Sequence, residues 1–152
     1  MKYLFSILIT FLVLNTALAQ KTQRTKNYNI DKTTLAIQGY DPVAYFISKK
    51  GIEGKKDINL ISEGVTYYFS TVQNRELFKA NPLKYEPQFG GWCAYAMGEN
   101  GEKVSVDHET FKIIDGKLYL FYNKFFNNTL KEWNKNENAL KQKAEQNWAK
   151  FK

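Results

Sequence analysis

Cys93 has the clearest chemical potential in this 152-residue sequence, because it is the only cysteine in the chain. Met97 follows it by four positions, so the two sulfur atoms would project from one face if the segment is helical. A thiolate and a thioether are ligands that Cu(I) prefers, and His108 could complete such a site from the following loop. Cys93, Met97 and His108 are therefore the candidate metal ligands.

Two other roles for Cys93 stay open. A free cysteine is often buried as a small hydrophobic residue, and this structural role is the one we favour. A reactive thiol would need a depressed pKa and exposure, and His108 could act as its base. His108 stands between Asp107 and Glu109, whose charges would favour its protonated form. We expect it to be an exposed loop histidine.

A second candidate site surrounds the motif GYDPVAYF at residues 39–46. Asp41 could accept backbone amides in an Asx-turn before Pro42, which would explain the motif by turn chemistry alone. Alternatively, Asp41 could line a small-molecule pocket with aromatic walls. The pocket candidates are Tyr40, Asp41, Trp92 and Tyr95. A wider aromatic set, which more often forms core, could provide the floor: Trp92, Tyr95, Tyr119, Tyr122 and Phe125.

The sequence lacks several common functional motifs. It has no glycine-rich phosphate loop between a strand and a helix, no paired-histidine zinc motif and no nucleophile elbow. These absences count against nucleotide binding and the commoner hydrolases. The formal net charge is +7, but only Arg24 and Arg75 are arginines, the side chain suited to bidentate phosphate contacts. The scattered lysines therefore indicate a solvated surface and no nucleic-acid partner.

The first 19 residues form the three-part pattern of a cleavable secretory signal: a basic start at Lys2, an apolar run over residues 4–14, and small residues up to Ala19. Ser6 and Thr10 interrupt the apolar run, and a membrane span needs roughly 20 uninterrupted apolar residues. We therefore predict cleavage after Ala19, export to a periplasm or beyond, and no membrane span in the mature protein.

The mature chain is predicted to hold one domain. Residues 20–30 are polar and basic with little periodicity, which is typical of a flexible leader. Residues 31–152 have the length of a single domain with a hydrophobic core. Because Cys93 has no partner for an intramolecular disulfide, burial must hold the fold together.

Two β-hairpins are predicted, over residues 58–70 with a turn at 63–64 and over residues 111–123 with a turn at 115–116. One face of the first hairpin should be buried, because apolar residues alternate there: Val65, Tyr67 and Phe69. The second hairpin has apolar residues on both faces, so we expect it to lie more centrally.

Helices should surround the hairpins. Ser70 and Gln73 have the spacing of a capping box, which predicts a helix over residues 71–81. A short strand is predicted at Val104 and Val106. A buried helical stripe is indicated by Leu140, Ala144, Trp148 and Phe151, after an earlier helix with Leu130 and Trp133. The predicted fold class is α+β: a small antiparallel sheet built from two β-hairpins with C-terminal helices packed on it.

The two hairpins share a spacing. Gly64 is followed by Tyr67 and Phe69, and 52 residues later Gly116 is followed by Tyr119 and Phe121. An internal duplication would explain this match. We favour a simpler explanation, because any hairpin needs a turn glycine and strands favour aromatic residues.

Four motifs and a late tryptophan carry a family resemblance. They are GYDPVAYF at residues 39–46, GVTYYFSTVQNRELFKANPLKY at 64–85, FGGWCAYAMGENG at 89–101, FKIIDGKLYLFYN at 111–123, and Trp148. Together they resemble the exported branch of the YHS-domain family over roughly residues 34–148. The resemblance implies a YHS-like fold, and other YHS domains resemble small treble-clef metal-binding modules, some attached to copper transporters.

The chain departs from that family at the metal-binding positions. The family pattern places one cysteine after Asp-Pro-Val and two after the Tyr-Phe strand, and here those positions hold Ala44, Ser70 and Asn74. A methyl, a hydroxyl and a carboxamide cannot replace thiolates as ligands for a soft metal. The resemblance thus implies copper as a cofactor, and these three residues predict that its usual local site has been lost.

The leading functional prediction is a non-catalytic exported module that binds a small ligand or a copper-type metal, with Cys93, Met97 and His108 as ligands. The alternatives are a thiol-dependent enzyme that uses Cys93 and a structural or interaction protein. The absence of recognised catalytic motifs favours a protein that is not an enzyme.

Overall fold

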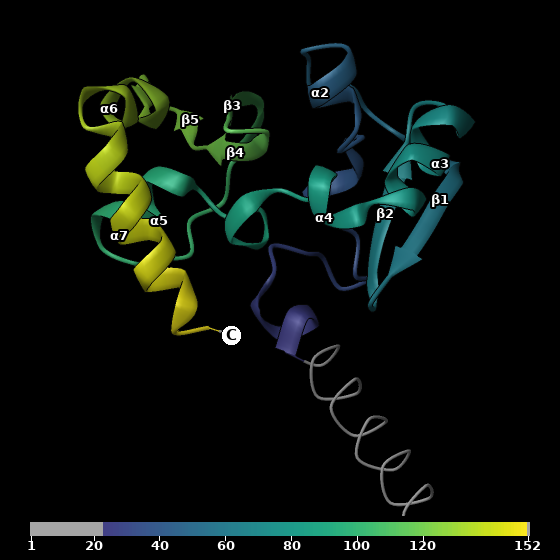
Figure 1. Cartoon of the computed structure of the whole chain (residues 1–152), viewed down its shortest axis with the longest axis horizontal. Coiled ribbons are helices and arrows are strands. Elements are labelled where there is room, and N and C mark those ends of the chain that lie inside the picture. Colours follow the sequence, from purple (N-terminus) through teal and green to yellow (C-terminus); the bar gives the residue numbers. More distant parts are fainter. Residues whose placement is uncertain (1–22, 152) are drawn as a thin grey trace, which may run out of the picture.

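The computed structural model describes residues 23–151. The predicted signal peptide and its cleavage site after Ala19 lie outside the described residues. The fold is α+β, as predicted, with small two-stranded antiparallel sheets and several helices (Figure 1). The elements are η1 (Ile37–Gly39), α2 (Ala44–Ile47), β1 (Lys55–Ser62), β2 (Val65–Phe69), α3 (Val72–Ala80), α4 (Pro82–Tyr85), η2 (Gln88–Gly91), α5 (Ala94–Glu99), β3 (Asp107–Ile114), β4 (Lys117–Phe121), β5 (Asn123–Lys124), β6 (Asn127–Asn128), α6 (Thr129–Lys135) and α7 (Glu137–Ala149).

Both predicted hairpins form, with their turns at the predicted residues. The turn residues 63–64 and 115–116 all have positive φ, which two-residue hairpin turns of type I′ require. The prediction of one shared sheet is wrong, because each hairpin is a separate two-stranded sheet. Each hairpin instead meets the chain that precedes it: β2 bridges to Leu35 and β4 bridges to Pro87.

The two hairpins are built on the same plan, displaced by 52 residues. β1 and β2 correspond end for end to β3 and β4. In the first hairpin the register shifts between Lys55 and Asn59, and in the second it shifts between Asp107 and Phe111. The strands therefore share their length, their turn and their irregularity.

The same displacement extends to the loops before each hairpin. Residues 37–39 have φ values of 53°, 48° and 88°, and residues 89–91 have values of 55°, 60° and 85°. The parallel bridges to Leu35 and Pro87 are also 52 residues apart. Turn glycines and aromatic strands do not account for this correspondence, so the simpler explanation favoured from the sequence is wrong. The geometry supports an internal duplication.

Strand β4 lies between two hydrophobic cores. The first half of the fold runs from η1 to α4, and the second half runs from η2 to α7. Leu118 and Leu120 of β4 belong to a core formed mainly by the first half, which includes Phe69 and Phe78. Tyr119 and Phe121 alternate with them and belong to a second core that includes Trp133 and Trp148. These four side chains of β4 are fully buried, so the prediction that the second hairpin is the more central one is confirmed.

Helix α7 packs on α5 and closes the second core. Leu140, Ala144 and Trp148 form the predicted buried stripe, and Phe151 packs against the same core. Gly98 of α5 permits the close approach of the two helices, because a Cβ atom there would lie 2.5 Å from the carbonyl oxygen of Leu140.

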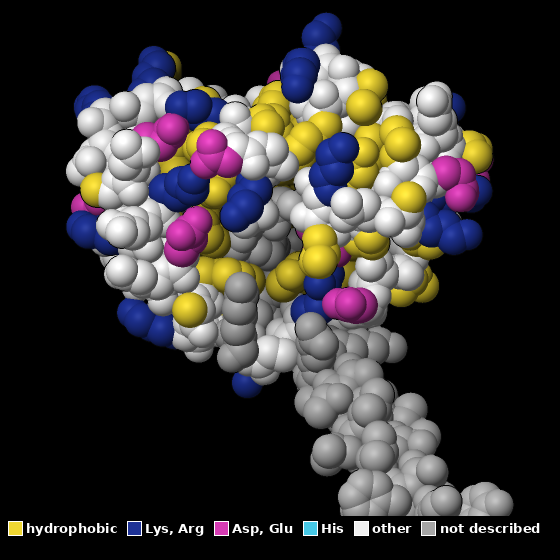
Figure 2. Space-filling model, in the orientation of Figure 1, with side chains coloured by type: hydrophobic (Ala, Val, Ile, Leu, Met, Phe, Trp, Pro, Cys, Tyr) yellow, Lys and Arg dark blue, Asp and Glu magenta, His cyan; other side chains and the backbone are white. Residues whose placement is uncertain are grey.

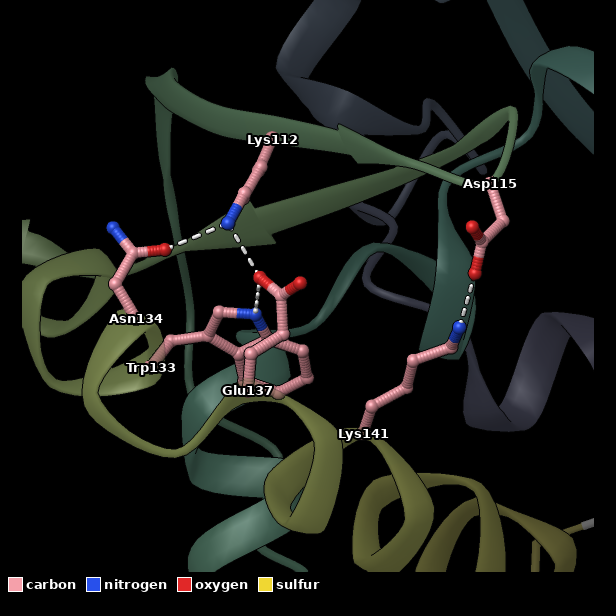
Figure 3. A network of polar contacts seen from close by, with 6 residues as sticks. All are labelled: Lys112, Asp115, Trp133, Asn134, Glu137 and Lys141. Atoms are coloured by element: carbon pink, nitrogen blue, oxygen red, sulfur yellow. Dashed lines mark hydrogen bonds and ion pairs between the residues drawn. The ribbon is translucent and has the colours of Figure 1, made fainter.

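Polar contacts attach the second hairpin to the C-terminal helices (Figure 3). Lys112 of β3 donates to the carboxylate of Glu137, which also accepts a hydrogen bond from the indole of buried Trp133. Lys141 of α7 pairs with Asp115 at the hairpin turn. Exposed ion pairs stabilise a fold only slightly. Glu137 matters more, because a buried indole N–H without a partner would be costly.

The described part of the predicted leader is docked on the domain, so the prediction of flexibility is wrong for residues 23–30. Residues 23–27 are helical. The guanidinium of Arg24 lies 2.9 Å from Glu63 and 2.6 Å from Glu86, and the indole of Trp92 donates to the carbonyl oxygen of Asn27. These partners are distant in sequence, which is why the polar leader gave no sign of them.

The short strand predicted at Val104 and Val106 is also absent, and residues 101–106 have no regular structure. The carbonyl oxygen of Val104 accepts the amide of Cys93 at 2.9 Å. This segment therefore forms a hydrogen bond with the turn before α5 and does not pair with a strand.

The surface agrees with the interpretation of the lysines as solvated. On the face shown in Figure 2, basic and acidic side chains are interleaved and do not form one basic patch. Within residues 23–151, no helix has the length and apolar character needed to cross a bilayer.

Replacing Gly98 by alanine should lower the free energy of unfolding by about 2 kcal/mol, because the new Cβ meets a backbone carbonyl that moves only if α7 moves. This loss is a net value: the clash itself costs more, and the higher helix propensity of alanine offsets about 1 kcal/mol of that cost. Glu99→Ala, an exposed position on the same helix, is the matched control and should change stability by less than about 0.5 kcal/mol. Equal effects of the two variants in urea unfolding would contradict this close approach.

Candidate functional site

Asp41 is a buried carboxylate at the start of α2, and none of its surface is exposed. Its Oδ1 atom accepts the backbone amides of Val43 at 2.8 Å and Ala44 at 3.3 Å. This is the Asx-turn predicted from the GYDP motif, and the prediction is confirmed. The turn ends the left-handed segment at residues 37–39 and starts the short helix.

The second oxygen of Asp41 binds the end of the first hairpin. Oδ2 accepts hydrogen bonds from the Ser70 amide at 2.8 Å, the Ser70 hydroxyl at 2.6 Å and the Asn74 side-chain amide at 2.7 Å. The carboxylate thus accepts five hydrogen bonds in all. This number of donors compensates for the burial of a negative charge.

The role predicted for Ser70 as a helix cap is wrong. Thr71 is the N-cap of α3, and its hydroxyl oxygen accepts the amide of Asn74 at 3.1 Å. Ser70 instead donates its hydroxyl to Asp41, because the hairpin end lies directly against the Asx-turn. The sequence pattern placed the cap one residue too early.

Ala44, Ser70 and Asn74 therefore lie around one point. These are the positions at which the family resemblance places cysteines, and each of the three residues donates a hydrogen bond to Asp41. An internal carboxylate with its donors occupies the centre of this group. The contacts join α2, the end of β2 and α3.

Cys93 occupies the place in the second half that Asp41 occupies in the first. The amide of Asp41 donates to the carbonyl oxygen of Ile52, and the amide of Cys93 donates to that of Val104. The Sγ atom of Cys93 accepts the amide of Tyr122 at 3.3 Å, as Asp41 accepts the amide of Ser70. The two residues are thus equivalent acceptors in the two halves.

The thiol of Cys93 is enclosed by protein. Its exposed fraction is zero, and its second polar neighbour is the hydroxyl of Thr129 at 3.4 Å. Thr129 begins α6 and donates to the carbonyl oxygen of Tyr122. The sulfur atom therefore connects three elements: the turn before α5, the end of β4 and the start of α6.

Met97 and Cys93 belong to different hydrophobic cores. The Met97 side chain is fully buried in the second core, whereas Cys93 packs in the first. Among residues 23–151, no three histidine, cysteine or carboxylate side chains lie close enough together to hold a metal ion. The assignment of Cys93, Met97 and His108 as metal ligands stays a prediction.

The expectation that His108 is an exposed loop residue is wrong. It lies in β3 with 7% of its surface exposed, and its ring stacks on Tyr40 at a centroid distance of 5.0 Å. Burial lowers the pKa of His108 below its ordinary value, an effect that exceeds the opposing charge of Asp107, and Lys124 lowers the pKa further. The expected shift toward the protonated form is therefore also wrong, because desolvation outweighs the neighbouring carboxylate.

The four predicted pocket residues are distributed over both halves. Asp41 is enclosed by its donors, and Tyr40 stacks on His108. Trp92 uses its indole N–H to hold the N-terminal segment, and Tyr95 packs partly buried against both cores. Of the wider aromatic set, Tyr119 is core, whereas Phe125 is 89% exposed.

Sequence reasoning missed the donors Asn74, Tyr122 and Thr129. A signal for Tyr122 was present, because Ser70 follows Asp41 by 29 residues and Tyr122 follows Cys93 by the same distance. Extending the period of 52 residues from the hairpin glycines to these positions would have identified the pair.

No protein-family model, no curated protein and no solved structure matches this chain. The resemblance to YHS domains therefore stays a prediction.

The variant Asp41→Asn should lower the free energy of unfolding by about 3 kcal/mol. Each carboxylate oxygen accepts at least two N–H donors, so in either orientation the new N–H₂ group would face two donors and leave them without an acceptor. Asp31→Asn is the matched control. Asp31 also accepts two backbone amides, from Thr33 and Leu35, but in an exposed turn, so the loss should stay below about 1 kcal/mol. Similar losses for the two variants in urea unfolding would show that the buried network is unimportant.

His108 should make stability depend on pH below neutrality. Its pKa is lowered in the folded state, so below about pH 6.5 the unfolded chain binds a proton that the folded chain does not. The free energy of unfolding should therefore decrease as pH falls from 7 through 6.5, until the folded-state pKa is reached.

The chain has one histidine, so His108→Gln should remove this pH dependence, and the single imidazole can be titrated by NMR without ambiguity. A folded-state pKa above about 6.5 would contradict the burial argument.

Proposed function

We propose that this chain is a non-catalytic exported binding module. The observation that supports its non-catalytic role is that its two buried chemical groups are used in internal contacts. The carboxylate of Asp41 and the sulfur of Cys93 each accept the backbone amide at the end of a hairpin, and each also contacts a residue of a helix. Neither group is available to a substrate, because both have no exposed surface.

The surroundings of Cys93 do not favour a thiol enzyme. A nucleophilic thiol needs access and an adjacent base. The described polar partners of the Cys93 sulfur are a backbone amide and a hydroxyl, and neither takes up a proton near neutral pH. His108 is engaged elsewhere, in its stack with Tyr40.

A candidate ligand for this module is a soft metal ion, and the family that the chain resembles suggests copper. It is favoured by one observation: Cys93 is equivalent to Asp41, around which the family's cysteine positions gather. Cys93 packs in the first core and Met97 in the second, so a site with both sulfur atoms and His108 would draw on both cores.

Reaction of the protein spanning residues 20–152 with a thiol reagent tests the non-catalytic role. We expect native Cys93 to react about 100-fold or more slowly than the unfolded chain, because the thiol is reached only through transient opening. A fast reaction in native buffer would favour the thiol enzyme.

Anaerobic titration with Cu(I) against a competing chelator separates the ligands. Cys93→Ser is the matched variant, because it keeps the size and the acceptor of the side chain but removes the soft sulfur. One tight equivalent that is lost in the variant would identify a metal as the ligand. Equal tight binding by both proteins would exclude Cys93 as a metal ligand, and no tight binding by the wild type would leave an organic ligand or a protein partner.

A further inference from the structure

The short ribbon formed by β5 and β6 interrupts the repeat. In the first half, residues 70–71 connect β2 to α3, whereas in the second half residues 122–128 connect β4 to α6. The extra residues form the two-stranded ribbon, which lies next to β3 (Figure 1). The first half folds without such a ribbon, so the ribbon is not required by the shared plan.

The tip of this ribbon exposes two adjacent aromatic side chains. Lys124 pairs with Asn127, which leaves Phe125 and Phe126 as the two turn residues. Their exposed fractions are 89% and 110%, the largest among the exposed large hydrophobic residues of the described chain. Two phenylalanines with this exposure are unfavourable in water unless something covers them.

The backbone at the tip is strained as well. Phe125 and Phe126 have φ values of 51° and 63°, the left-handed region that bulky residues avoid. Asn-Gly is the sequence that such a turn favours. The chain thus keeps two residues that suit neither the turn nor the solvent, and violations of this kind occur mainly at functional sites.

The base of the ribbon is held firmly. Thr129 donates its amide and hydroxyl to the carbonyl oxygen of Tyr122, and Asn123 donates to the hydroxyl of Thr110. Asn128 caps α6 by accepting the amide of Leu130. The tip is therefore presented on a fixed support and is not part of a loose loop.

The sequence around the tip is basic. Lys124 is the only charged residue between positions 118 and 130, and Lys131 follows on α6. Both lysines are exposed, and neither forms an ion pair with a described carboxylate. Their charges are thus free to meet an anionic surface.

We propose that Phe125 and Phe126 insert into the interface of an anionic lipid membrane, with Lys124 and Lys131 contacting the lipid headgroups. Phenylalanines beside lysines are the composition of segments that lie in a bilayer interface. A protein partner fits less well, because two phenylalanines bury about 150–250 Å² each and a stable protein interface needs roughly 800 Å² per partner. This inference does not depend on the proposed function or on the ligand of Cys93.

Co-sedimentation of the protein spanning residues 20–152 with vesicles tests the proposal. One set of vesicles is phosphatidylcholine alone, and the other contains about 30% phosphatidylglycerol to supply negative surface charge. The main variant is Phe125→Asn with Phe126→Gly, which removes both aromatic rings and gives the turn its favoured sequence, so the fold should be retained. Leu83→Ser, an exposed apolar position on α4, is the matched control.

We expect the wild type to bind anionic vesicles, and the double variant to bind them about tenfold more weakly. Lys124→Gln should weaken binding about fivefold, whereas Leu83→Ser should have no effect. Absence of wild-type binding, or equal binding by the double variant, would overturn the proposal. So would self-association of the wild type, measured by sedimentation, that the double variant lacks, because the tip would then be a protein contact.

Discussion

The burial of strand β4 on both faces is the constraint on which the rest of the structure depends. Its side chains alternate between two cores, so one strand supplies Leu118 and Leu120 to the first and Tyr119 and Phe121 to the second. Because each core draws on the same strand, neither half is complete without the other. The docked N-terminal segment and α7 then pack against the second core, through Tyr28 and Trp148.

Each half is closed by one buried acceptor that receives the amide at the end of its hairpin. Asp41 does this with a carboxylate and Cys93 with a sulfur atom. The carboxylate needs many donors because it is charged, and it has five. The thiol is apolar enough to be buried with two weak contacts. The same backbone plan has thus been stabilised by two different chemistries.

Local patterns were interpreted correctly where the physical cause was itself local. The hairpin turns, the Asx-turn at Asp41 and the stripe from Leu140 to Trp148 depend on residues within a few positions of one another. The errors at His108, Ser70 and the leader share one cause. Each was assigned from its immediate neighbours, whereas its surroundings come from segments far along the chain: Tyr40 for His108, Asp41 for Ser70, and Glu86 for Arg24.

The sequence by itself determined the α+β class, the two hairpins and the candidate importance of Asp41 and Cys93, because period, turn chemistry and residue type are properties of short segments. Only the tertiary structure decided that these two residues are equivalent acceptors, that Met97 lies in another core, and that the tip with Phe125 and Phe126 remains uncovered. Burial and hydrogen-bond partners depend on contacts between residues such as Asp41 and Asn74, which are 33 positions apart. No local pattern specifies such contacts.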